Sequence, residues 1–296
     1  MAGHLHFQTP SALAYFAALV ADDAGFPVLE AAIALAQDED PRLDVQGVLA
    51  RVDVLALRLK RRMPADAPAL QRLRLLNRYF FQELGFAGNV NDYHDPRNSL
   101  LPVVLESRRG IPITLALLYC EIAGQIGLTT QPLPFPGHVL VKVAILHGDV
   151  VLDPFNGQSL SRQTLQERLP PLQRHSPMTR AQGAHDEDRD HGSEPLSLEP
   201  FLQPAPGRAL IARMLRNLRH IYSRHQDWMR LERVQARTVL LLPEAWEEHR
   251  DHAIVLAELG AHWGAAQALA LYLQHRPDAA DAPALRRRLA AWRSAP

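Results

Sequence analysis

The sequence predicts an α+β domain followed by an all-α region of helical repeats, and three observations support this fold class. A helix that is apolar nearly all round spans 112–126. Two β-branched strands follow it, at 138–146 and 150–153. From residue 208 the pattern is wholly helical, with a period near 34 residues. We therefore expect a small antiparallel sheet packed on a buried central helix, with a repeat domain behind it.

The composition is that of an ordinary globular protein of 296 residues, with 47% apolar and 22% charged residues. The 32 basic and 32 acidic residues cancel, which argues against a nucleic-acid or membrane partner. A single cysteine cannot form an internal disulfide, which favours a reducing compartment. The apolar run at 12–20 lacks a preceding basic region and is interpreted as a helix rather than a signal peptide. We expect a cytoplasmic location.

Helical patterns dominate the first 84 residues. Three lie within 11–63 and a fourth covers 69–84, where Gly85 ends it. The following stretch, 85–98, is rich in Gly, Asn and Asp and predicts a loop. Its Asp and His side chains are better explained by turn chemistry than by a metal site, and we expect neither metal nor cofactor. Ser99 is a candidate N-cap for a helix over 100–107.

The stretch 108–157 places polar residues at the ends of apolar elements. Gly110-Ile111-Pro112 marks the start of the buried helix, and a proline-rich loop at 131–137 leads into His138. Gly148-Asp149 is a turn signal, and Asp153 lies at the end of the second strand. A helix N-terminus facing a His and an Asp on neighbouring strands is the layout of thiol acyl-transfer chemistry.

A family resemblance follows from the same residues. The runs RRGIPITLALLY, PGHVLVK and LDPFNG resemble the core of the SirB family of bacterial transglutaminase-like proteins. The similarity extends to 76–105 and 213–222, and so covers nearly the whole chain. It implies a transglutaminase-like, papain-like domain in which His138 and Asp153 are two positions of a catalytic triad. It also implies that Pro112 stands where active transglutaminases carry the cysteine.

Two other residues are candidates for the missing nucleophile. Thr114 offers a hydroxyl close to the helix start, although a Thr there is also a common helix cap. Cys120 lies six residues further along and is interpreted as a small core residue. The candidate catalytic set is therefore His138, Asp153 and Thr114.

The hairpin register decides whether the candidate pair can meet. A two-residue turn at Gly148-Asp149 would put Asp153 opposite Ala144, about 20 Å along the strand from His138. The two side chains meet only if the hairpin centre lies nearer Ile145-Leu146, with a wider loop. We adopt this second register, which the family resemblance implies.

The domain boundaries follow from shifts in composition. We expect the transglutaminase-like domain at 1–173, with a helical part at 11–84 and a core at 85–173. Residues 174–207, which include HDEDRDHGSE, predict a linker or flexible insertion. Residues 208–296 predict tetratricopeptide-like repeats, because Pro243 and Pro277 close helices 34 residues apart. So few repeats cannot bury a core alone, so we expect them to pack on the first domain.

Two functions remain open from the sequence. The first is a regulatory or protein-interaction protein that binds a protein partner through its repeats and lacks thiol catalysis because of Pro112. The alternative is an acyl-transfer or hydrolytic enzyme that uses His138 and Asp153 with an unconventional nucleophile or an activated water. Whether the protein is an enzyme at all is left undecided.

Overall fold

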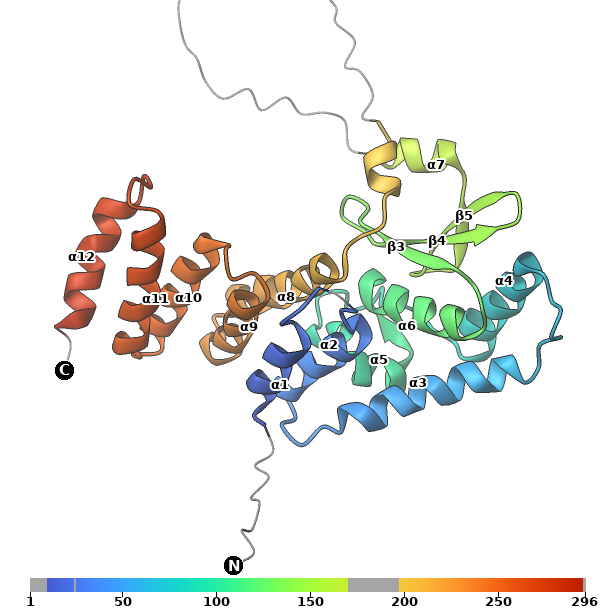
Figure 1. The fold of residues 1–296 in the computed structure, drawn as a ribbon, viewed down its shortest axis with the longest axis horizontal. Coiled ribbons are helices and arrows are strands. Elements are labelled where there is room, and N and C mark those ends of the chain that lie inside the picture. The colour runs from blue at the N-terminus through green and yellow to red at the C-terminus, as the bar shows by residue number, and fades with distance from the viewer. Residues whose placement is uncertain (1–9, 24, 170–196, 295–296) are drawn as a thin grey trace, which may run out of the picture.

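The computed structural model describes residues 10–23, 25–169 and 197–294. Figure 1 shows an α+β domain in which a small sheet lies on a layer of helices, joined to a row of antiparallel helices that ends at the C-terminus. This arrangement confirms the fold class expected from the sequence.

The helical layer is built by the N-terminal half of the chain around the buried helix α6, Pro112–Gln125. Its face away from the sheet packs against α3, and its other face packs against β4. Almost every α6 side chain up to Tyr119 is buried, as the all-round apolar pattern indicated. The helices around it are α1 (Ala12–Leu19), α2 (Val28–Ala34), α3 (Val45–Lys60), α4 (Ala69–Asn77) and α5 (Leu101–Ser107).

The helix expected at 69–84 changes its winding halfway. After α4 the chain continues as a π-helical segment, Arg78–Glu83, and ends at Gly85 in a left-handed conformation. The wider turn brings Phe80 against Phe86 and Tyr119, with ring centroids 4.4 and 5.3 Å apart. The altered winding thus coincides with a cluster of packed aromatic rings.

The start of α5 differs from the sequence prediction. The residue at the N-cap position is Leu100, and it supplies no side-chain cap. Ser99 instead ends a short 3-10 helix, Pro96–Ser99, and is buried. The first-turn Pro102 needs no amide partner at this position, so α5 begins without the expected serine cap.

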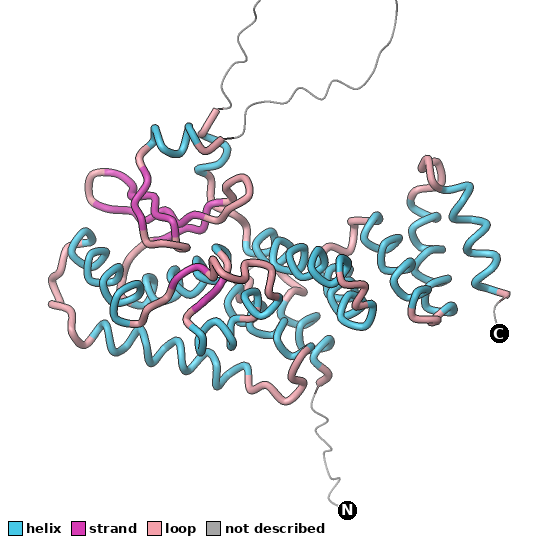
Figure 2. The backbone as a smooth tube through the Cα atoms, turned by 180° about the vertical axis from the view of Figure 1, so that it is seen from behind, coloured by secondary structure: helices cyan, strands magenta, loops and turns pink. Residues whose placement is uncertain are grey.

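The sheet has four antiparallel strands in the order β3-β4-β5-β6. They are β3 (Thr130–Leu133), β4 (Leu140–Ile145), β5 (Gly148–Asp153) and β6 (Gln158–Leu160). The sequence predicted only the two central strands and assigned most of β3 to the proline-rich loop. Pro132 is tolerated because β3 is an edge strand. Figure 2 shows the sheet standing on one side of the helical layer.

The β4–β5 hairpin turns at Leu146-His147, with Ile145 paired to Gly148. The turn signal at Gly148-Asp149 was therefore misplaced by two residues, because these residues begin β5 instead. The centre of the hairpin lies close to the adopted register, but its loop has two residues and is not wide. Gly148 has φ 132°, which explains the glycine at the first strand position.

The segment between the two regions is described from residue 197 on. The motif HDEDRDHGSE lies outside the described residues. Residues 197–206 pack against the sheet: the Ala205 amide donates to the Pro132 carbonyl at 3.0 Å. A second apolar cluster joins this segment to the sheet and to α7 (Arg162–Glu167), through Leu133, Phe135, Leu140, Leu165 and Leu198.

The C-terminal helices follow the predicted repeat. They are α8 (Gly207–Arg224), α9 (Trp228–Leu241), α10 (Trp246–Glu258), α11 (His262–His275) and α12 (Ala282–Arg293). Pro243 and Pro277 each follow a helix end, as expected. The repeats pack on the first domain, because α8 contacts α2 and α9 contacts α1. The fully buried Arg237 reinforces this junction with two hydrogen bonds of 2.7 Å to Asp38.

Candidate functional site

The structure brings His138 and Asp153 together at one end of the sheet. Asp153 is the last residue of β5, and His138 lies two residues before β4. Val141 pairs with Leu152, so the two polar residues lie just beyond the last paired positions of neighbouring strands. The His138 Nε2 atom is 2.7 Å from the Asp153 Oδ1 atom.

Asp153 is held as a buried carboxylate, with only 5% of its side chain exposed. Burial alone would raise its pKa, but the hydrogen bond and charge of His138 oppose this. The Phe155 amide donates to Oδ1 at 2.9 Å, and the Arg168 guanidinium lies 3.3 Å from Oδ2. These bonds outweigh burial, and the pKa of Asp153 is lowered from its ordinary value.

His138 keeps one ring nitrogen available. Because an ionised Asp153 can only accept, Nε2 carries the proton of this hydrogen bond and Nδ1 is the acceptor of a neutral ring. The side chain is 24% exposed, in contrast to its partner. An imidazole oriented in this way by a carboxylate has the chemistry of a general base when its ring is neutral.

The peptide after Asp153 is fixed by a glycine that sequence reasoning did not single out. Gly88 in β1 (Ala87–Gly88) donates its amide to the Phe155 carbonyl at 2.7 Å. A β-carbon at Gly88 would overlap the Phe155 ring, so this position requires glycine. The Phe155 ring also packs edge-on against His138, with centroids 6.1 Å apart. Arg168 on the turn after α7 gave no sequence signal at all, because only the fold brings it to Asp153.

The N-terminus of α6 carries no free nucleophile. Pro112 is the first helical residue and is buried. The Thr114 hydroxyl is fully buried, accepts from the Ile111 amide at 3.2 Å, and lies 2.9 Å from the Asn98 carbonyl. Its hydrogen-bonding capacity is therefore used to fix the helix start.

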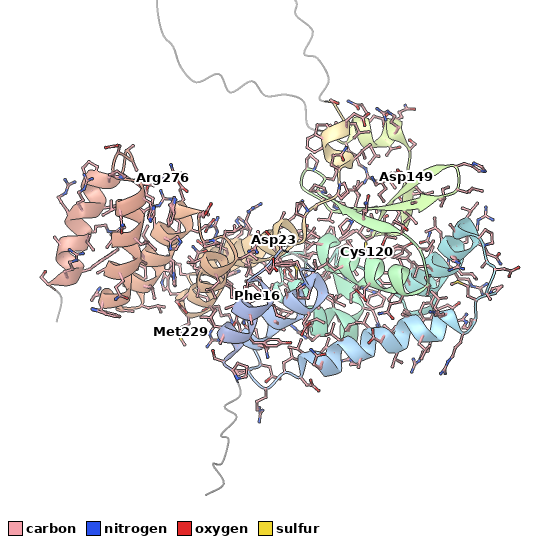
Figure 3. All side chains as sticks on the ribbon, viewed as in Figure 1. Phe16, Asp23, Cys120, Asp149, Met229 and Arg276 are labelled. Carbon is pink, nitrogen blue, oxygen red and sulfur yellow. The ribbon has the colours of Figure 1, made fainter. Side chains whose placement is uncertain are left out.

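Cys120 lies away from the His138–Asp153 pair. Its carbonyl accepts from Thr130, which pairs with Val143 at the opposite end of β4 from His138. Five residues of extended strand separate Val143 from His138, or about 16 Å. Burial raises the pKa of the Cys120 thiol to about 12. Figure 3 marks Cys120 on α6. At this separation along the strand the thiol is out of hydrogen-bond reach of the imidazole.

The loop after β1 is organised by amide side chains. The buried Asn98 donates to the Asp92 carbonyl at 2.7 Å, and its Oδ1 accepts from Asn89 at 3.0 Å. The Asp95 side chain accepts from the Arg97 amide at 2.8 Å. These are the turn interactions that the composition indicated. Among the described residues, no group of three or more His, Cys, Asp or Glu side chains is placed to hold a metal ion.

A second concave feature lies in the repeats, between α8, α9 and α10. This repeat groove has a volume of about 470 Å³. Arg216, His220 and Arg224 line its α8 side, while apolar walls come from Trp228, Leu231, Ile254 and Val255. Gln235 also lines it, and its buried Oε1 atom has no hydrogen-bond partner among the described residues.

Comparison with known proteins agrees with the fold. Residues 46–216 match the model of the transglutaminase-like superfamily, and residues 218–290 match a tetratricopeptide repeat model. The chain therefore belongs to the transglutaminase-like superfamily and carries tetratricopeptide repeats behind that domain.

The relatives that match most of the chain are bacterial proteins of similar length. The chain is 35% identical to a UPF0162 protein of Xylella fastidiosa over 258 residues, covering 87% of this chain and 86% of that protein. It is 26% identical to a UPF0162 protein of Vibrio cholerae over 209 residues, 70% of each chain. A shorter stretch of 72 residues, 24% of this chain and 12% of the other protein, is 40% identical to F-box only protein 21 of Homo sapiens. No solved structure matches the chain.

Among the helices of the described residues, none combines the length and apolarity that a bilayer crossing requires.

Proposed function

We propose that this protein is a SirB-type regulatory protein that binds a protein partner through its repeats and has no thiol catalysis. In this proposal Pro112 occupies the position of the nucleophile. The observation that carries the proposal is that neither nearby candidate, Thr114 or Cys120, is placed to replace it. The Thr114 hydroxyl is hydrogen-bonded to backbone groups at the start of α6. The Cys120 thiol lies near the end of β4 that is distant from His138. In this proposal Thr114 is structural, and His138 and Asp153 remain without a covalent nucleophile.

The repeat groove favours a partner that presents an acidic segment. Arg219 is neutralised by Glu248 at 2.7 Å, but Arg216 and Arg224 have no counter-ion among the described residues. These exposed guanidinium groups stand beside apolar walls, so an acidic segment with apolar side chains complements both features.

The test is site-specific photo-crosslinking from Ser223, which lines the groove, in the native bacterium. The crosslinked partner is then purified, and its affinity is measured for the wild type, Arg216→Glu and Arg287→Glu. Arg287 is exposed on α12 outside the groove and serves as the charge-matched control. We expect a crosslinked peptide of acidic composition and at least about a tenfold loss of affinity in Arg216→Glu alone. Equal affinities for the two variants would contradict the proposal.

A second function, acyl transfer or hydrolysis by an activated water, is favoured by one observation. An imidazole with a free Nδ1, held by an ionised carboxylate, is arranged to take a proton from water. A screen of amide, ester and thioester substrates should then give an activity that His138→Ala abolishes and Cys120→Ala preserves. A wild type inactive on all three classes would leave the binding function in place.

A further inference from the structure

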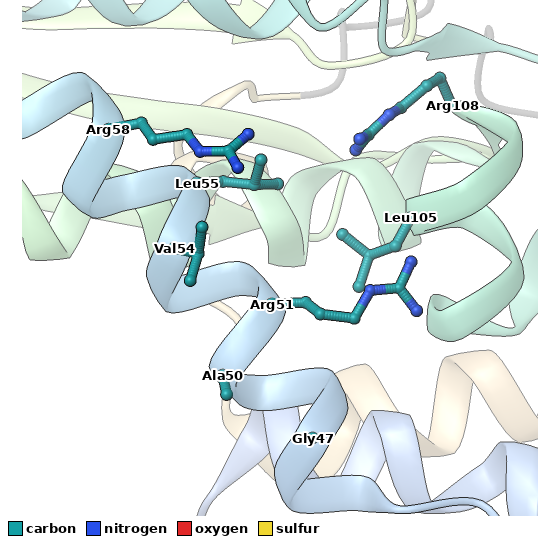
Figure 4. Close-up of a pocket in the computed structure, with 8 residues that line it drawn as sticks. All are labelled: Gly47, Ala50, Arg51, Val54, Leu55, Arg58, Leu105 and Arg108. Atoms are coloured by element: carbon teal, nitrogen blue, oxygen red, sulfur yellow. The ribbon is translucent and has the colours of Figure 1, made fainter.

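Three arginines surround a hollow on the opposite side of the first domain from the sheet. The hollow lies between α3 and α5 and has a volume of about 320 Å³. Figure 4 shows the guanidinium groups of Arg51, Arg58 and Arg108 directed into it, with Leu55 and Leu105 between them. Helix α6 separates this arginine pocket from β4, so it is distinct from the His138–Asp153 pair.

Arg108 occupies a backbone position that usually belongs to glycine. It follows the last residue of α5 and has φ 59°, in the left-handed region. A non-glycine residue here carries a conformational cost, although glycine would end the helix without it. We therefore expect the Arg108 side chain to make a contribution, to stability or to binding, that offsets this backbone cost.

Arg108 is half-buried, and its guanidinium has no anionic partner among the described residues. Its Nη1 atom is inaccessible and makes no hydrogen bond to any residue that the structure describes, and the group stacks on the Phe86 ring at 4.6 Å. Burial, and then the charge of Arg51, lower its pKa. The buried Arg237 provides a contrast within this chain, because Asp38 holds it with two hydrogen bonds. Arg108 lacks the carboxylate that Arg237 has.

The charges around the pocket do not balance. Arg58 has no counter-ion among the described residues, and Arg51 is paired only with the exposed Glu106, at 3.3 Å. Glu83, a further acid in this region, is engaged by Arg62 at 2.6 Å. The Tyr79 hydroxyl donates to the Leu55 carbonyl and supplies no negative charge. Arg58 and Arg108 are therefore two guanidinium groups of the pocket lining that have no carboxylate partner among the described residues.

We propose that the arginine pocket binds a phosphate group, either free phosphate or that of a small phosphate monoester. A dianion matches the two uncompensated charges, and its oxygens accept the paired N–H groups that guanidinium presents. The volume suits a small ligand, and the apolar side chains of Val54, Leu55 and Leu105 can contact the carbon part of a monoester. This site is independent of the function proposed above.

The test is calorimetric titration of the full chain with inorganic phosphate and with phenyl phosphate, at constant ionic strength. We expect one saturable site per chain. Arg58→Gln should weaken it by about tenfold or more, because a charge-assisted pair is lost. Arg61→Gln is the matched control, since Arg61 follows the end of the same helix, is exposed and does not line the pocket. If phenyl phosphate binds more tightly than inorganic phosphate, the ligand is a phosphate monoester. If the two bind equally, the ligand is free phosphate.

Arg108→Gly separates a binding role from a structural one. Glycine relieves the left-handed backbone and removes a buried unpaired donor, so the unliganded variant should melt no lower than the wild type while losing phosphate binding. A lower melting temperature together with unchanged binding would overturn the role of Arg108. Absence of saturable binding in the wild type, or equal losses in Arg58→Gln and Arg61→Gln, would overturn the proposal itself.

Discussion

The strand side and the helix side of the candidate site use their polar groups differently. On the strand side, Asp153 is a buried, ionised carboxylate. His138 is partly exposed, and only one of its ring nitrogens is bonded to Asp153. On the helix side, the Thr114 hydroxyl is buried and fully used by backbone groups, and Pro112 has no polar side chain. The comparison teaches that polar side chains of similar burial can serve different ends: Asp153 orients a partly exposed imidazole, whereas Thr114 only fixes the start of a helix.

The largest effect is expected from Asp153→Ala on the strand side. This change leaves the Phe155 amide and the Arg168 guanidinium without their acceptor in a buried site. The free energy of unfolding should fall by about 3 kcal/mol, measured by denaturant titration. Asp149→Ala, on the exposed part of the same strand, is the control and should change it by less than about 0.5 kcal/mol. Similar losses of unfolding free energy in the two variants would contradict the claim that hydrogen bonds to the Asp153 carboxylate stabilise the fold.

On the helix side, Thr114→Val should cost less, about 1–2 kcal/mol of unfolding free energy. The change keeps the shape but leaves the Ile111 amide and the Asn98 carbonyl without the hydroxyl. Thr129→Val, at an exposed position beyond α6, is the matched control and should be nearly neutral. A neutral Thr114→Val would show that its hydroxyl is not needed to start the helix.

A smaller effect is expected from pH, because protonation leaves the Asp153 carboxyl group in place. Its pKa is lower in the folded protein than in the unfolded chain, so its ionisation stabilises the fold above the unfolded value near 4. That contribution is lost as the pH falls through the lowered folded value. The stability difference between the wild type and Asp153→Asn should therefore narrow as the pH is lowered below about 4. A constant difference across this range would contradict the lowered pKa.

Much of the site was visible in the sequence because its elements have strong local patterns. The apolar run of α6 and the strand-end positions of His138 and Asp153 gave the layout, and the family register placed the pair close together. The Gly148-Asp149 signal misled because glycine there serves a strand position with φ 132° and not the turn. The turn itself contains Leu146, and leucine is not among the residues that favour turns.

The remaining features depend on contacts between distant segments. Arg168 reaches Asp153 only through the path of α7, and Gly88 is required only because the Phe155 ring covers it. The arginine pocket likewise joins α3 to the end of α5, residues that no motif connects. Sequence patterns report periodicity along one element, and these sites arise where elements meet.

The measurement that tests the central claim most directly is the thiol pKa of Pro112→Cys in a Cys120→Ala background. The rate of alkylation by iodoacetamide as a function of pH gives this pKa. If position 112 is the nucleophile position, the helix N-terminus and His138 should lower the thiol pKa to below about 7.5, and adding His138→Ala should raise it. A thiol pKa of about 8.5 or higher that does not respond to His138→Ala would contradict the account.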